Sequence, residues 1–184
     1  IADECFMPLT VGGGIRSIED VRRLLQVGAD KVAVNTAALE TPDLIAKIAS
    51  RFGAQCVIAS IDARRAPAGG YEVYTRSGTT ATGKDPVALA REVEKAGAGE
   101  ILLTSVERDG TLEGYDLDLT RRVSEAVSIP VIASGGAGTA EHMAQAVLEG
   151  KASAVAAASC YTFTQLTPLE VKRHLASRGI AVRL

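Results

Sequence analysis

The sequence predicts an α/β protein: a (β/α)8 barrel of the duplicated half-barrel type, with strands three to eight present in this chain. Two observations support this prediction. Apolar runs alternate with helical patterns six times along the 184 residues, which is typical of parallel strands joined by helical crossovers. In addition, Pro8–Ile15 (PLTVGGGI) recurs as Pro130–Ala137 (PVIASGGA), so units one and two return as units five and six. A repeat of four units implies eight in the whole fold, and residues 1–184 are expected to form one incomplete domain of this kind.

The repeat extends beyond its glycines. When the two copies are aligned on their prolines, Gly14 corresponds to Gly136, 122 residues later. After one extra residue the next strands also correspond, VAVNTAA and VAAASCY, which pairs Thr36 with Ser159. We therefore expect two related strand–turn units on opposite sides of one barrel mouth.

Six apolar runs predict the strands. Runs of this length, rich in Val, Ile and Ala and followed by turn residues, are typical of parallel strands buried on both faces. The expected strands are Met7–Val11, Lys31–Asn35, Gln55–Asp62, Glu100–Thr104, Val131–Ser134 and Ser153–Ala158.

Capping signals place the helices between these strands. Ser17 precedes a helical pattern with Glu19 in its first turn, and Gly28 ends that pattern. Thr41-Pro and Asp85-Pro open two more helices. The expected helices run from Ser17 to Gly28, Thr41 to Phe52, Asp85 to Lys95, Leu117 to Val127, Thr139 to Glu149 and Pro168 to Ser177, and Ile1–Phe6 resembles the end of an earlier one.

Residues 63–83 interrupt the alternation. The segment RRAPAGG has the composition of a loop, whereas YEVYTRSG alternates like one arm of a small hairpin. We expect an excursion from the barrel with a flexible tip.

Composition limits the classes of function. The net charge of −2 gives no support for nucleic acid or an anionic membrane as a partner, and no apolar run is as long as a membrane span. Cys5, Cys56 and Cys160 are unclustered, as expected for reduced thiols in a cytoplasmic protein. His142 and His174 both fall in helical patterns away from the glycine turns. We therefore expect neither a metal nor a cofactor.

Glycine turns after two strands suggest phosphate binding. In a barrel the carboxyl ends of the strands form the working face, and backbone N–H groups at such turns bind phosphate. For either turn alone the glycines could simply permit a tight turn, but the paired repeat favours a substrate with a phosphate at each end. A barrel that binds a flavin is a distant alternative, because one site would suffice for the phosphate of the cofactor and the repeat predicts two. The first phosphate site is predicted at Gly14, Asn35 and Thr36, and the second at Gly136, Ala158 and Ser159.

Asp62 is the predicted acid/base residue. It ends the apolar run VIASID, and an unpaired carboxylate would be costly in the core, so it should face the mouth. Partial burial would raise its pKa and suit proton transfer near neutral pH. Alternatively, Asp62 caps its own loop or pairs with Arg64 or Arg65. Asp109 in ERDGT is a second candidate, although Asp-Gly is also a common turn signal.

Two charges stand at the opposite ends of the strands. Lys31 and Glu100 each begin a strand, where a barrel floor would otherwise be apolar. Facing inward, they would pair across the axis, close the floor and act as a gate. Alternatively both side chains turn into solvent, and composition alone favours that alternative.

Several segments together resemble a known family. PLTVGGGI, GADKVAVNTAA, RFGAQCVIASIDA, LLTSVERDGT and IPVIASGGAG, in this order, are similar to the cyclase subunit of imidazole glycerol phosphate synthase, a lyase of histidine biosynthesis. The sugar isomerase of the same pathway has the same duplicated half-barrel. It typically has Gly-Thr where this chain has Asn35-Thr36, and an acid at the strand end that reads LLTS here. Both differences favour the cyclase.

The resemblance implies a reaction and a partner. Ammonia from a glutaminase, bound as a heterodimer, would enter through the floor and attack the ribulosyl carbonyl of a bisphosphate substrate. Ring closure and C–N cleavage would give imidazole glycerol phosphate and an aminoimidazole carboxamide ribotide. The implied roles are acid/base for Asp62, substrate contact for Thr36, Thr104, Asp109 and Ser134, floor gate for Lys31 and Glu100, and glutaminase docking for Asp30 and Gln55.

The family's second acid/base aspartate belongs to strand one. The chain opens in a helical pattern, so we expect it to lack the first two strand–helix units and that aspartate, and to leave two open sheet edges. Three interpretations remain: a cyclase that needs the missing quarter, the isomerase, or a non-catalytic remnant that binds bisphosphates or the glutaminase.

Overall fold

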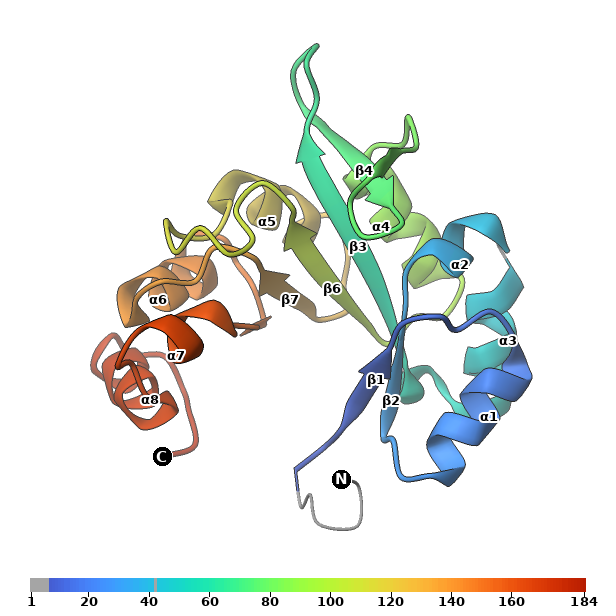
Figure 1. The fold of residues 1–184 in the computed structure, drawn as a ribbon, viewed down its shortest axis with the longest axis horizontal. Coiled ribbons are helices and arrows are strands. Elements are labelled where there is room, and N and C mark those ends of the chain that lie inside the picture. Colours follow the sequence, from blue (N-terminus) through green and yellow to red (C-terminus); the bar gives the residue numbers. More distant parts are fainter. Residues whose placement is uncertain (1–6, 42) are drawn as a thin grey trace.

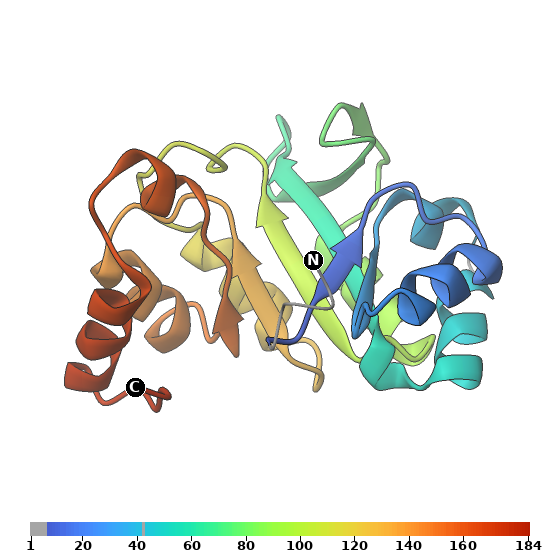
Figure 2. The same ribbon diagram turned by 60° about the horizontal axis from the view of Figure 1, so that its bottom comes forward.

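A computed structural model describes residues 7–41 and 43–184 of the chain. Parallel strands in the order β1-β2-β3-β6-β7-β8 form a sheet that curls into part of a barrel, with helices along its convex side (Figures 1 and 2). The prediction of a partial (β/α)8 barrel is confirmed. The helix end expected at residues 1–6 lies outside the described residues.

The strands begin and end close to the predicted positions. Their bounds are β1 Thr10–Gly12, β2 Lys31–Val34, β3 Val57–Arg65, β4 Tyr71–Thr75, β5 Thr80–Ala81, β6 Glu100–Ser105, β7 Val131–Ser134 and β8 Ala154–Val155. The strand expected at residues 153–158 is thus reduced to two paired residues, since only Ala154 and Val155 pair with β7.

Capping residues explain the helices. Ser17 and Thr167 each form a capping box, with Asp20 and Glu170 respectively, and Asp85 caps the helix that begins at Pro86. The helices are α1 Ile18–Gln26, α2 Thr36–Glu40, α3 Asp43–Phe52, α4 Pro86–Lys95, α5 Leu117–Ser124, α6 Ala140–Leu148, α7 Ser159–Phe163 and α8 Pro168–Ser177, with a 3-10 turn η2 at Ala54–Cys56.

Two short helices were not predicted. α2 follows β2 and α7 follows β8, each has five residues, and they begin at the repeat-related Thr36 and Ser159. The residues before them, Asn35 and Ala158, make no side-chain capping bond, so the usual sequence signal is missing. Their matched positions show that the internal repeat extends into the local structure.

Strands β2, β6 and β7 are buried on one face only, so the expectation of two buried faces was wrong for them, whereas β3 is buried on both faces at its start. Burial alternates strictly along β2, β6 and β7. Residues such as Ile101 and Leu103 pack outward against the helices and are at most 2% exposed, while Leu102 between them is half-buried. The described strands complete only part of the ring, so their concave face keeps contact with solvent.

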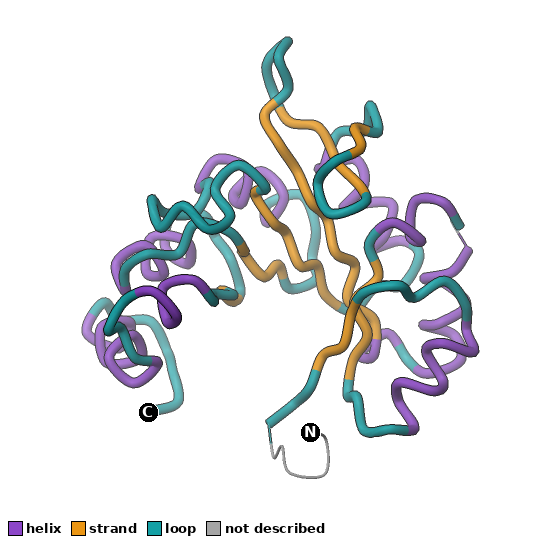
Figure 3. The backbone as a smooth tube through the Cα atoms, in the orientation of Figure 1, coloured by secondary structure: helices purple, strands orange, loops and turns teal. Residues whose placement is uncertain are grey.

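β3 ends at Arg65, three residues beyond the expected Asp62, and leads into a hairpin. Its last four residues pair antiparallel with β4, from Asp62 opposite Tyr74 to Arg65 opposite Tyr71 (Figure 3). The arginines expected in a loop therefore belong to the strand, and the connecting turn is shorter, at residues 66–70. Arg65 and Tyr71 also stack, with 5.1 Å between the guanidinium carbon and the ring centroid.

The apolar core lies between the convex face of the sheet and the helices. One cluster includes Ile45, Ile48 and Ile61, and a second surrounds Met143 and Cys160 beneath α6 and α8. Among the helices that the structure describes, none combines the length and apolarity that a membrane crossing requires.

Candidate active site

The sheet register aligns three predicted site residues. Asp62 on β3 is opposite Thr104 on β6, and Thr104 is opposite Ser134 on β7. The residue before each of them is buried against the helices, so these three side chains point to the concave face. They form one polar row at the carboxyl ends of the strands.

A cavity of about 540 Å³ lies at one end of this row. We call it the first cavity; it is lined by all three residues of the predicted first phosphate site, Gly14, Asn35 and Thr36, together with Asp62. Gly13 and Gly14 have φ of 100° and 69°, and a Cβ at either position would meet no atom within 4 Å. Backbone conformation therefore requires these glycines, and the space beside them is open to a ligand.

A smaller cavity of about 160 Å³ lies at the other end of the row. This second cavity brings together Asp109 and Ser134 with all three residues of the predicted second phosphate site, Gly136, Ala158 and Ser159. The glycine turn is here packed against the β6–α5 loop: a Cβ on Gly136 would lie 2.2 Å from the carbonyl oxygen of Gly114. Close packing alone therefore requires a glycine at position 136, so the glycine is not in itself evidence for phosphate. The phosphate prediction depends on the cavity that the turn lines.

Asp62 is positioned to exchange protons. Its partial burial raises the pKa of the carboxyl above its ordinary value, a hydrogen bond with the Asn35 side chain lowers the pKa, and the negative charge of Asp109 raises it. Arg65 pairs with Asp116 instead, at 3.6 Å, and Arg64 stacks over Tyr74. Neither arginine neutralises Asp62, contrary to the alternative considered from the sequence.

Lys31 and Glu100 form an ion pair on the concave face. They occupy the first positions of β2 and β6, on either side of β3, and both are partly buried. The pair lies at the amino ends of the strands, opposite the two cavities. The expectation that the two side chains face inward and pair is confirmed, and the solvent-facing alternative favoured by composition is wrong. Because only β3 separates their strands, they do not pair across the axis, and their role as a floor gate stays a prediction.

These features can now be set beside known families. Residues 1–166 match the family described as histidine biosynthesis protein. The chain belongs to this family. The family includes both the cyclase subunit and the isomerase of histidine biosynthesis, so it identifies the pathway and leaves the choice between the two reactions open.

Other predicted residues of this histidine biosynthesis protein have local structural roles. Asp30 accepts a hydrogen bond from the Leu9 N–H at 2.7 Å, which joins the start of β2 to the chain entering β1. Gln55 is exposed, and its Nε2 donates to the Phe52 carbonyl at 3.4 Å. Both lie at the amino ends of the strands, and their role in docking a glutaminase stays a prediction.

Sequence reasoning missed four polar residues of the first cavity: Arg16, Glu40, Arg76 and Ser77. Arg16 lies two residues after the glycine turn and could have been found there. Arg76 could not, because it lies on the turn between β4 and β5, which folds back to the mouth. There its backbone N–H donates to Thr36 Oγ1 at 3.2 Å.

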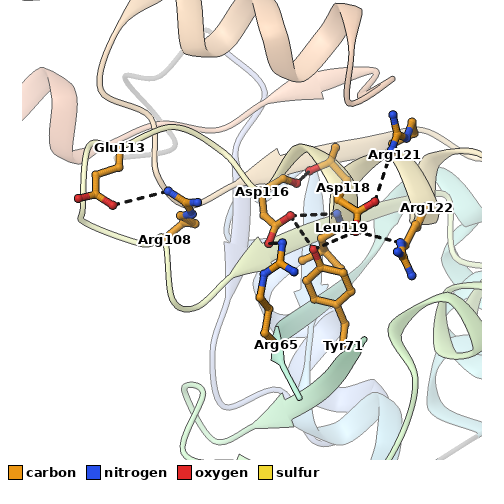
Figure 4. Close-up of polar contacts among 10 residues, drawn as sticks. Arg65, Tyr71, Arg108, Glu113, Asp116, Asp118, Leu119, Arg121 and Arg122 are labelled. Carbon is orange, nitrogen blue, oxygen red and sulfur yellow. Dashed lines mark hydrogen bonds and ion pairs between the residues drawn. The ribbon is translucent and has the colours of Figure 1, made fainter. Parts of the chain in front are cut away.

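A polar cluster joins the hairpin to the β6–α5 loop of this family member (Figure 4). The Tyr71 hydroxyl donates to buried Asp116 at 2.8 Å and lies 3.3 Å from Asp118. Asp116 also caps α5 by accepting from the Leu119 N–H at 3.0 Å. Burial and the adjoining Asp116 carboxylate raise the pKa of Tyr71, so the phenol stays protonated and donates. The cluster ties the hairpin that follows Asp62 to the end of the loop that contains Asp109.

Proposed function

We propose that this chain belongs to the cyclase subunit of imidazole glycerol phosphate synthase. Ammonia from a partner glutaminase condenses with the ribulosyl carbonyl of phosphoribulosyl-formimino-aminoimidazole carboxamide ribotide. Ring closure and C–N cleavage then yield imidazole glycerol phosphate and an aminoimidazole carboxamide ribotide. The isomerase of the same pathway is the alternative.

The observation that most favours the cyclase is the Lys31–Glu100 ion pair on the concave face. An isomerase has one reactant, which enters at the mouth. A cyclase needs a second route for ammonia, and a polar pair at the amino ends of the strands suits a gate on that route. The exposed Asp30 and Gln55 lie at the same end, where the glutaminase would dock.

The two cavities suit a substrate with two phosphates. The first cavity contains Asp62 and the second contains Ser134, with Thr104 between them in the same row. Neighbouring strands are about 4.8 Å apart, so the row spans roughly 10 Å. A bisphosphate bound at both ends would place its central carbons over the hydroxyl of Thr104 and beside the carboxyl of Asp62.

Asp62 would move the protons of the condensation. When ammonia adds to the carbonyl, the nitrogen loses protons and the oxygen departs as water. A carboxyl with a raised pKa can protonate that oxygen and then accept a proton from the nitrogen. Thr104 and Ser134 would orient the substrate by hydrogen bonding, and Asp109 would contact the substrate from the second cavity.

A substrate comparison tests this function. The chain is incubated with the ribulosyl substrate and high ammonium at alkaline pH, alone and with a polypeptide that supplies two further strand–helix units. The cyclase proposal predicts consumption that requires ammonium in at least one of these mixtures. Conversion of the aldose substrate without ammonium would identify the isomerase, and substrate binding without any turnover would indicate a binding remnant.

A further inference from the structure

We propose that Arg76 binds a phosphate group in the first cavity, and that Glu40 holds its guanidinium at the rim until the phosphate arrives. The first cavity then has a cationic side chain that can bind phosphate, whereas the described residues lining the second cavity include none. The inference rests on the proposed function only for the identity of the phosphate, which we take to be one end of the bisphosphate.

Contacts fix the backbone of Arg76 and leave its side chain movable. The backbone N–H donates to Thr36 Oγ1 at 3.2 Å, which anchors the β4–β5 turn beside the predicted phosphate site. The guanidinium lies 3.4 Å from Glu40, and the two side chains are 70% and 58% exposed. Such an exposed pair contributes little to stability, so a phosphate can readily draw the guanidinium away from Glu40.

The backbone of this turn adopts an unusual conformation. Among the described residues, four other than glycine have positive φ, and two of them are Arg76 and Ser77, at 51° and 58°. Side chains rarely adopt the left-handed region, and strain of this kind is concentrated at functional sites. Both residues line the first cavity, so the strained turn brings a charged side chain to the ligand space.

The two cavities differ in charge. The described residues that line the second cavity include no lysine or arginine, and Asp109 is its one charged residue. The first cavity contains two carboxylates, Asp62 and Glu40, which would repel a phosphate dianion. It also contains two arginines, Arg16 and Arg76, that offset this repulsion. The glycine turns and hydroxyls follow the internal repeat, but Arg76 comes from the hairpin outside it. We therefore expect two phosphate sites of unequal affinity.

Titration of the ¹⁵N-labelled chain with inorganic phosphate tests this proposal. Amide shifts of Gly13, Gly14 and Thr36 report the first cavity, and those of Gly136 and Ser159 report the second. Charge-assisted hydrogen bonds are strong, so Arg76→Gln should weaken binding in the first cavity by about tenfold or more and leave the second unchanged.

Glu40→Gln separates ligand binding from a structural role. It breaks the same ion pair but frees the guanidinium, so phosphate should bind the first cavity about two- to fivefold more tightly. If Arg76 only stabilised the turn, both substitutions would weaken binding alike. Arg22→Gln is the matched control, because Arg22 forms an exposed pair with Glu19 at 3.0 Å on α1, and it should have no effect.

Three results would overturn the proposal: no phosphate shifts in the first cavity of the unmodified chain, unchanged binding in Arg76→Gln, or weaker binding in Glu40→Gln. The amide spectrum of each variant shows whether it is folded. Phosphate binding that depends on Arg76, with no turnover of the ribulosyl substrate even when two further strand–helix units are supplied, would leave this inference intact and count against the proposed reaction.

Discussion

Replacing Asp116 by alanine should destabilise the protein by about 2–4 kcal/mol. The carboxylate is only 7% exposed, accepts from the Tyr71 hydroxyl at 2.8 Å and caps α5 through the Leu119 N–H at 3.0 Å. Loss of a helix cap costs about 1 kcal/mol, and loss of a hydrogen bond to a charged group costs about 1.5–3 kcal/mol. The nearby Asp118, 3.3 Å from the Tyr71 hydroxyl, can compensate in part, which keeps the total below the sum.

Urea denaturation followed by circular dichroism measures this loss. Asp116→Asn keeps an oxygen acceptor for the cap and the phenol, and should cost about 1 kcal/mol. Tyr71→Phe should also cost about 1 kcal/mol, and the Tyr71→Phe/Asp116→Ala double variant should be less destabilised than the two single changes added together. Glu92→Gln is the control, since Glu92 forms an exposed ion pair with Lys84 at 3.0 Å outside this cluster. Fully additive effects, or equal losses in the alanine and asparagine variants, would refute this account of the cluster.

Three further predictions concern the site. Gly136→Ala should destabilise the fold by about 2–4 kcal/mol in urea denaturation, because its Cβ would lie 2.2 Å from a backbone oxygen. Gly14→Ala should cost only about 1–2 kcal/mol, because its φ of 69° is its one source of strain. Lys31→Met should reduce glutamine-driven turnover while turnover with added ammonium persists; an equal loss of both would exclude a gate. Asp109→Asn should lower the pKa of Asp62 by removing a negative charge, so the acid limb of the pH–rate profile should move to lower pH; an unmoved limb would contradict this coupling.

The raised pKa of Asp62 also affects stability. Its carboxyl has a higher pKa in the folded state than in the unfolded chain, so the unfolded state binds fewer protons between the two values. The free energy of unfolding therefore falls as pH rises through this range, and the loss stays constant at higher pH. Asp62→Asn should be more stable than the parent near pH 7, and the difference should vanish in acid. Urea denaturation at both pH values measures it; a variant less stable at pH 7 would contradict the assigned pKa direction.

Local sequence signals predicted much of the fold because caps and apolar runs act over a few residues. Asp85-Pro predicts a helix that begins at Pro86, where α4 begins, and the expected helix Pro168–Ser177 has the same bounds as α8. Strand burial was mispredicted because an apolar run is equally compatible with one buried face or two. The extent of β3 depended on pairing with β4, an interaction between segments that the run VIASID alone does not contain.

The predicted site residues were found through the repeat and the strand ends. Parallel strands bring their carboxyl ends to one edge, so Asp62 and Ser134 could be placed on a common face from sequence alone. Arg76 could not be placed in this way, since its position depends on how the hairpin folds back over Thr36. The charge difference between the two cavities therefore becomes visible only in the structure.

The most direct test of the central claim compares Asp62→Asn with the parent in ammonium-dependent turnover and in substrate binding. If Asp62 transfers protons to and from a bisphosphate bound across the two cavities, kcat should fall by about 10²–10⁴-fold while the Kd of the bisphosphate changes by less than about threefold. Unchanged turnover would contradict the assignment of Asp62. A parallel loss of binding and turnover would show that Asp62 binds the substrate and transfers no proton.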